Sequence, residues 1–133
     1  MHWADQYVGL PFQVDGRDRQ GIDCWGLVRL VWAERAGFEM PEFARVADRA
    51  LTIGREAQAF AEIIKEETRD LDAVIMNEDV LTKSGWVKAP VHIGLIVGRP
   101  GLVLHARRGI LSCIEPLNRV DPVSFRRGPA HAR

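Results

Sequence analysis

The sequence predicts an α+β domain with a helical first half and a β-sheet in the second half. Apolar residues follow a helical period up to about residue 67, and short runs rich in β-branched residues begin at about residue 73. Helices followed by strands, rather than an alternation of the two, are typical of α+β domains. No repeat or linker divides the 133 residues, so we expect one domain over 1–133, with 126–133 as a basic tail.

The composition is that of a globular domain. Hydrophobic residues make up 47% and charged residues 27%, which excludes disordered and fibrous proteins. Lys plus Arg and Asp plus Glu are both 18, so a net charge of zero gives no general attraction to nucleic acid or anionic lipid. No apolar run approaches the roughly 20 residues of a membrane span. The N-terminus lacks the pattern of a secretory signal, so we expect synthesis in the cytoplasm.

The first half contains the predicted helices. Residues 3–8 form a short helix, and a polar loop follows over 13–21. The central helix starts after Asp23, a good N-cap, and ends at Gly37, which suits a C′ position. Its apolar residues surround most of the circumference, so it should be largely buried. A further helix over 55–67 has one apolar face and should lie on the surface.

The second half contains the predicted strands. They cover 73–76, 91–97, 102–106 and 110–114, and a long loop over 77–90 separates the first from the second. The last three are separated by short turns, so we expect an antiparallel meander.

Cys24 is the first helical residue after the Asp23 cap. A helix N-terminus carries roughly half a positive charge, which favours a thiolate, and its N–H groups can hold an oxyanion. Gly26 leaves space beside the sulfur. The alternative is a small apolar core residue, which is the more common place for a free cysteine.

Two of the four histidines lie inside predicted strands. His2 and His131 are terminal and receive no role, whereas His92 and His105 have apolar neighbours. A single histidine in such a place is more often a core residue than a catalyst. If Val97 pairs with Leu102, however, both imidazoles lie on one face of the sheet, within reach of each other.

These positions suit nucleophilic catalysis. A thiol needs a base that accepts its proton, and the base needs a third group that fixes its tautomer. A helix N-terminus carrying Cys24, packed on a sheet that carries His92 and His105, supplies all three groups. We expect His92 to act as the base and His105 to orient it.

Cys113 allows several interpretations. Alternation makes it an ordinary strand residue, a disulfide with Cys24 is a second interpretation, and a zinc site from Cys24, His92, His105 and Cys113 is a third. The spacings of a zinc site are absent, so we expect no metal and no cofactor. Asp15, Asp18 and Asp23 are interpreted as solvated or capping, and Trp25 as either a core residue or a wall of a cleft.

Four segments resemble the NlpC-type cell-wall cysteine peptidases. Gly21–Val28 resembles the nucleophile motif, His92–Gly98 the histidine strand, Leu104–Ala106 the motif of the third polar residue, and Tyr7–Phe12 the segment before the nucleophile loop. Two residues depart from the family pattern. Trp25 follows the cysteine where a small hydroxyl residue is usual, and Phe12 stands where a tyrosine is common.

The resemblance implies a papain-like fold in which the helix carrying Cys24 packs on an antiparallel sheet, with His92 and His105 as the other catalytic residues. It further implies cleavage of peptidoglycan stem peptides at the bond between D-γ-glutamate and a diamino acid. Asp23, Trp25 and Phe12 flank the nucleophile and are expected to contact the substrate.

The Cys-Trp-Gly run is most similar to that of short peptidases of phage tails and gene-transfer particles. This implies a place in a virion tail and tail-tip or baseplate partners, for which segments 126–133 and 55–67 are candidate docking elements. Two alternatives stay open: a structural tail component with little catalysis, and acyl transfer to another acceptor.

Overall fold

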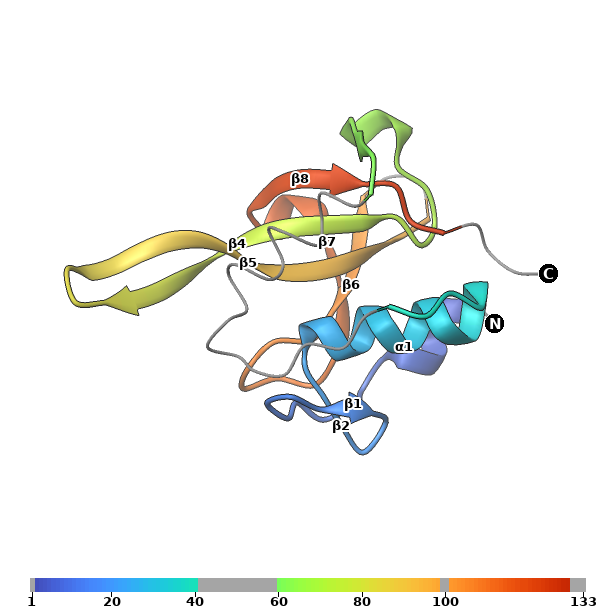
Figure 1. Cartoon of the computed structure of the whole chain (residues 1–133), viewed down its shortest axis with the longest axis horizontal. Helices are drawn as coiled ribbons and strands as arrows, with labels where there is room; N and C mark the ends of the chain where they lie inside the picture. Colours follow the sequence, from blue (N-terminus) through green and yellow to red (C-terminus); the bar gives the residue numbers. More distant parts are fainter. Residues whose placement is uncertain (1, 41–59, 99–100, 130–133) are drawn as a thin grey trace.

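A computed structural model describes residues 2–40, 60–98 and 101–129, and it confirms the α+β class. The long helix α1 (Cys24–Ala36) packs against a six-stranded antiparallel sheet with the strand order β3-β8-β4-β5-β6-β7 (Figure 1). The strands are β3 (Glu62–Ile63), β4 (Ala73–Thr82), β5 (Gly85–Val97), β6 (Leu102–His105), β7 (Cys113–Pro116) and β8 (Pro122–Arg126). Short 3-10 helices are η1 (Trp3–Tyr7), η3 (Lys65–Glu67) and η4 (Leu117–Arg119). Within the described ranges, none of the helices has the length and apolarity needed to cross a membrane.

The central helix begins and ends where the sequence predicts. The Asp23 side chain accepts a hydrogen bond from the Gly26 N–H, and Gly37 ends the helix in the left-handed region at φ 62°. The Gly37 N–H then donates to the carbonyl of Ala33, so a terminal carbonyl is satisfied. Seven helix residues are buried, which explains why apolar residues surround the helix: Cys24, Trp25, Gly26, Leu27, Val28, Val31 and Trp32.

The meander β5-β6-β7 has the predicted register. Val97 pairs with Leu102 and Leu95 with Leu104. One face of these strands packs on α1, where Leu95 and Leu104 join the main core. The opposite face has a second core that includes Val103 and Leu117, the first residue of η4. The third strand starts at Cys113 rather than at 110, because the Ser112 hydroxyl and backbone bond to the end of η1 and the segment after it, at Tyr7, Gly9 and Leu10.

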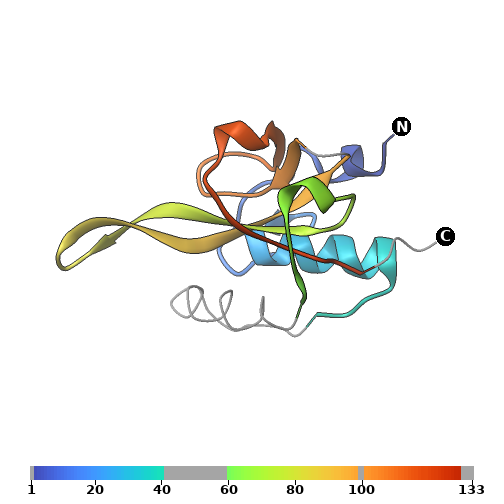
Figure 2. The ribbon, with the colours of Figure 1, turned by 90° about the horizontal axis from the view of Figure 1, so that it is seen from above.

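The predicted loop over 77–90 is wrong, because β4 and β5 continue through it as one hairpin. The hairpin closes between Thr82 and Gly85, and its outer part projects beyond the body of the molecule (Figures 1 and 2). Leu81 and Trp86 form a pair on this arm and are 64% and 70% exposed. Solvent reaches both faces of the arm, so its sequence lacks the alternation that marks a half-buried strand.

The predicted surface helix over 55–67 is wrong in its described part. Residues 60–67 form β3 and η3, and residues 55–59 lie outside the described residues. Ile64, assigned to the apolar face of that helix, is 59% exposed. Pairing of β3 with β8 overrides the helical pattern, and such long-range pairing leaves no local signal.

The C-terminal segment is part of the fold through Gly128 rather than a tail from residue 126. Strand β8 lies between β3 and β4 in the sheet. Beyond it, Arg127 and the Gly128 N–H both bond to the buried carboxylate of Asp72 at 2.8 Å. Residues 130–133 lie outside the described residues.

Candidate active site

Cys24 lies at the start of α1 and is 1% exposed. It belongs to the same buried cluster as Ile93, the residue after His92, and α1 packs against β5, the strand that carries the imidazole. Figures 1 and 2 both place this end of α1 beside the middle of β5. This position retains both properties expected of a nucleophile, a helix N-terminus and a neighbouring histidine strand.

Gly26, two residues after Cys24, serves packing rather than substrate access. A Cβ on Gly26 would overlap the carbonyl oxygen of Gly16, which belongs to the turn leading into strand β1 (Arg17–Asp18). This strand pairs with β2 (Gly21–Ile22), which leads directly into the cap of α1. The small hairpin is therefore held tightly against the first helical turn.

Asp23 holds the nucleophile turn in place. Its buried carboxylate accepts hydrogen bonds from the Gly26 N–H at 2.8 Å, the Asp15 N–H at 3.1 Å and Arg17 Nη1 at 2.9 Å. These contacts confirm the capping interpretation of Asp23, and an additional substrate contact stays a prediction. Asp18, in contrast, accepts a local hydrogen bond from the Gln20 N–H at an exposed position.

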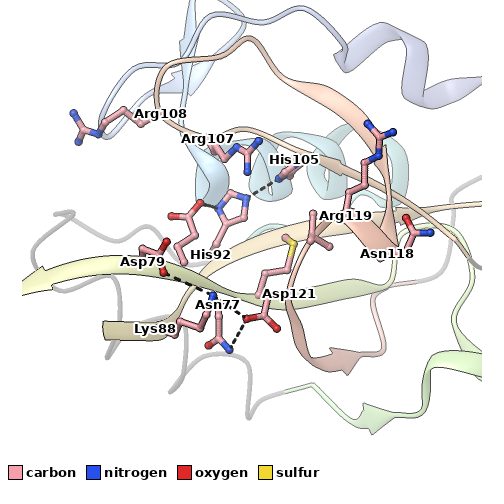
Figure 3. A pocket seen from close by; sticks show the side chains of 13 residues that line it. Asn77, Asp79, Lys88, His92, His105, Arg107, Arg108, Asn118, Arg119 and Asp121 are labelled. Atoms are coloured by element: carbon pink, nitrogen blue, oxygen red, sulfur yellow. Dashed lines mark hydrogen bonds and ion pairs between the residues drawn. The ribbon is translucent and has the colours of Figure 1, made fainter. Parts of the chain in front are cut away.

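The two strand histidines contact each other, as the predicted register requires. His92 Nε2 lies 2.8 Å from His105 Nδ1 (Figure 3), and His105 Nε2 lies 2.5 Å from Glu115 Oε2 on β7. The imidazoles are 2% and 1% exposed. The three side chains form a continuous hydrogen-bonded chain. His105, itself held by Glu115, therefore fixes the orientation of the His92 ring.

Burial lowers the pKa of His105 below its ordinary value. Glu115 opposes this shift through its hydrogen bond and charge, whereas the charge of Arg107 adds to it. His105 is therefore neutral at pH 7 and carries a single ring proton.

Glu78 is a site residue that the sequence analysis missed. Its carboxylate Oε1 lies 3.5 Å from His92 Nδ1, the ring nitrogen that does not face His105. The register of β4 against β5 shifts between Met76 and Glu78, so the shift lies directly before the residue that faces His92. Such irregularities re-aim side chains near active sites and have no reliable sequence signal.

A polar cleft of about 730 Å³ opens beside the two histidines (Figure 3). Four cationic and three anionic side chains are among the residues that line it: Lys88, Arg107, Arg108 and Arg119, and Glu78, Asp79 and Asp121. Lys88 lies 3.7 Å from carboxylate oxygens of both Asp79 and Asp121. The cleft therefore offers hydrogen-bond donors to an anionic or peptide ligand next to the imidazoles.

Trp25 and Phe12, the two departures from the family pattern, differ in environment. Trp25 is 4% exposed and packs in the core on the helix side, which favours its interpretation as a core residue. Phe12 is half-buried and forms an isolated bridge with Ile22. The guanidinium of Arg108 lies 5.9 Å from the centre of the Phe12 ring, so Phe12 supports a residue of the cleft. Direct substrate contacts of both aromatic residues stay predictions.

Both cysteines are free thiols, so the disulfide alternative is wrong. Among the described residues, ligand atoms of His105, Cys113 and Glu115 lie within 4.8 Å of one another, a set that differs from the zinc set considered above. Both ring nitrogens of His105 are already engaged, by His92 and Glu115. Burial, followed by the charge of Glu115, raises the pKa of the Cys113 thiol, which disfavours the thiolate that a metal needs.

Comparison with solved structures supports the fold. The NlpC/p60 domain of the peptidoglycan hydrolase SagA aligns with a TM-score of 0.67 and 19% identity, over 93% of this chain and 92% of that chain. An NlpC/P60 family protein from Bacillus cereus aligns with a TM-score of 0.69 and 20% identity, over 96% of this chain and 38% of that one. RipD from Mycobacterium tuberculosis, a non-catalytic NlpC/p60 domain protein adapted to peptidoglycan binding, aligns with a TM-score of 0.62 and 18% identity, over 93% and 90%.

No curated protein sequence matches the chain. The profile of the NlpC/P60 family, however, matches residues 9–120, a range that includes Cys24, His92 and His105. Since this range covers most of the 133 residues, the chain belongs to the NlpC/P60 family.

Proposed function

We propose that this protein is a cysteine endopeptidase that cleaves peptidoglycan stem peptides, at the bond between D-γ-glutamate and a diamino acid. The observation that carries the proposal is the presence in one fold of a capped, cysteine-bearing helix N-terminus and the hydrogen-bonded chain His92–His105–Glu115. Membership of the NlpC/P60 family and the similarity to the SagA domain support the choice of peptidoglycan as substrate.

The reaction follows from the roles of these groups. Nδ1 of His92 accepts the thiol proton of Cys24, and the sulfur attacks the peptide carbonyl. Backbone N–H groups at the start of α1 stabilise the oxyanion. His92 then returns the proton to the leaving amine, and water hydrolyses the thioester with His92 again as the base.

The arginine side chains of the cleft support a stem peptide as ligand. Such peptides carry free carboxylates on their D-glutamate and diamino acid residues, and the cleft beside His92 presents Arg107, Arg108 and Arg119. Guanidinium groups bind carboxylates in bidentate geometry, which orients a ligand as well as holding it.

Digestion of purified muropeptides, read by mass spectrometry, tests the proposal. Wild type and Cys113→Ala should release the same fragments, whereas Cys24→Ala should release none. The mass of the fragments identifies the cleaved bond. Equal digestion by wild type and Cys24→Ala would contradict the proposal.

A binding role without catalysis is the second candidate, because RipD has the same fold and is described as non-catalytic. Intact muropeptides that bind to both wild type and Cys24→Ala, with no product from either, would favour it. Transfer of the acyl group to an added amine, with little hydrolysis, would favour the acyl-transfer alternative.

A further inference from the structure

Glu115 is a carboxylate next to the candidate catalytic histidines, although it lies in a strand with no recognisable motif. Its Oε2 is 2.5 Å from His105 Nε2, and its Oε1 faces Arg107 Nη2 at 3.9 Å. Pairing of His105 with Cys113 aligns β6 with β7 and brings Glu115, two residues further along, to the same face of the sheet. The Glu115 side chain is 24% exposed, so it joins a buried imidazole to the solvent edge of the site.

The proton positions along this chain follow from one restriction. An ionised carboxylate can only accept hydrogen bonds, so the single proton of neutral His105 must lie on Nε2, facing Glu115. His105 Nδ1 then has a lone pair and accepts from His92 Nε2, which must carry a proton. The remaining nitrogen of His92, Nδ1, then has the lone pair that a general base requires. The Glu78 carboxylate also faces Nδ1, but at 3.5 Å it lies farther away than the partners at 2.8 and 2.5 Å that fix the other protons, so the shorter contacts set the tautomer.

We propose that Glu115 is a positioning residue that sets the tautomers of His105 and His92, so that Nδ1 of His92 is the basic nitrogen. Its effect on turnover rests on the proposed peptidase function, whereas its effect on the tautomers does not. Without Glu115, His105 can hold its proton on Nδ1. His92 Nε2 must then accept, and its own proton moves to Nδ1, where it blocks removal of the thiol proton.

The tautomers are measured directly by ¹⁵N NMR of the imidazoles. Cys24→Ala protein is used so that no ion pair forms between the Cys24 thiolate and a protonated His92. With Glu115 present, both histidines should be protonated at Nε2. In Glu115→Met, which has no acceptor, and in Glu115→Gln, whose amide can also donate, a second tautomer should appear. Glu66→Gln, a substitution at an exposed position of η3, is the matched control and should leave the spectrum unchanged.

Turnover is measured with the same substitutions in protein that retains Cys24. We expect kcat on muropeptides to fall about 10- to 100-fold, which is typical of the loss of a group that orients a functional histidine, with little change in KM. Circular dichroism verifies that each variant is folded. If Glu115→Met does not fold, the tautomers and kcat of the near-isosteric Glu115→Gln are compared with those of wild type instead.

Failure of the proposal for Glu115 and failure of the proposed peptidase function give different results. An unchanged His105 tautomer in a folded Glu115 variant overturns the proposal, and so does a changed tautomer with kcat within about twofold of wild type. If wild type cleaves no muropeptide but the tautomers change as expected, the proposed function fails while the assignment of the protons stands.

Discussion

At the scale of single residues, the two buried histidines differ in what their ring nitrogens face. Both nitrogens of His105 are engaged, one by His92 and the other by Glu115. His92 bonds to His105 through Nε2 only, and its Nδ1 lies on the side of Glu78. This asymmetry supports His92 as the base and His105 as the residue that orients it.

His92→Ala should therefore lose more activity than His105→Ala. Loss of a general base removes a contribution of about 10²- to 10⁴-fold, whereas loss of an orienting group leaves a base that still reaches the correct geometry part of the time. The measurement is kcat/KM on a purified muropeptide for both variants. A larger loss in His105→Ala would reverse the two roles.

His92 should also control the reactivity of Cys24. In a Cys113→Ala background, iodoacetamide should alkylate Cys24 more slowly at pH 7 when His92 is replaced by alanine, because the thiol then lacks its base. Mass spectrometry of the intact protein gives the rate. The matched control is His2→Ala, a substitution at an exposed position in the N-terminal segment. Equal rates in His92→Ala and the control would contradict a functional pair of Cys24 and His92.

Cys113 should need a higher pH than an ordinary cysteine before its thiol is alkylated. Burial and the charge of Glu115 raise the pKa of its thiol, so its thiolate forms only above its ordinary range. In Cys24→Ala protein, the alkylation rate should keep rising with pH beyond the ordinary cysteine value of about 8.5. A plateau reached at neutral pH would show a different environment.

At the scale of elements, one carboxylate joins three segments that lie apart in the sequence. Glu34 on α1 accepts from Tyr7 Oη of η1 at 2.6 Å and from both terminal nitrogens of Arg19, in the β1–β2 turn, at 2.8 and 2.7 Å. The hydrogen bonds from Arg19, with that of Tyr7, lower the pKa of Glu34 from 4.5 to about 2.

This network predicts a pH-dependent contribution to stability. A carboxyl whose folded pKa lies below its unfolded value stabilises the protein above the unfolded pKa, here 4.5, and the stabilisation is lost as the pH falls toward about 2. Because Arg19 and Glu34 are partly exposed, the effect should not exceed about 1 kcal/mol. Urea unfolding should show Glu34→Gln less stable than wild type at pH 6, and the difference should shrink near pH 2. A difference of equal size at both pH values would contradict this assignment.

The end of the chain is held by another carboxylate. Asp72, 1% exposed, accepts from Arg127 Nη1 and from the backbone N–H groups of Arg69 and Gly128. Arg127→Ala should lower the free energy of unfolding by about 1–3 kcal/mol, because it leaves a buried carboxylate without its charged partner. Urea unfolding measures the loss, and Arg69→Ala, which leaves the backbone contact intact, is the control. Equal stability of the two variants would contradict the anchoring role of Arg127.

At the scale of the whole molecule, the residues assigned to the candidate site come from three parts of the chain. The helix end supplies Cys24, the central strands supply His92 and Glu78, and β6 and β7 supply His105 and Glu115. The β4–β5 arm extends away from this body (Figure 2). Asp79 and Lys88, at the base of this hairpin, line the cleft, whereas Leu81 and Trp86, further out, are exposed.

We further propose that the protein is carried in a phage or phage-like tail, on the basis of the resemblance of its Cys-Trp-Gly run. It should then copurify with intact particles and stay attached through a high-salt wash if the contact is mainly apolar, because salt screens exposed charge pairs. Immunoblots of purified particles and of the soluble lysate measure its distribution. Recovery only from the soluble lysate would favour a free lysis enzyme and remove the structural tail component as an alternative.

Local patterns in the sequence determined the α+β class, both ends of α1 and the register that brings His92 next to His105. Each depends on near neighbours in the chain, namely the cap at Asp23, the glycine at Gly37 and the short turn before Leu102. The tertiary structure alone decided the insertion of β8 between β3 and β4 and the positions of Glu78 and Glu115. These features depend on the pairing of distant segments and on a bulge, and the side chains involved are ordinary charged residues whose sequence context resembles any solvated surface.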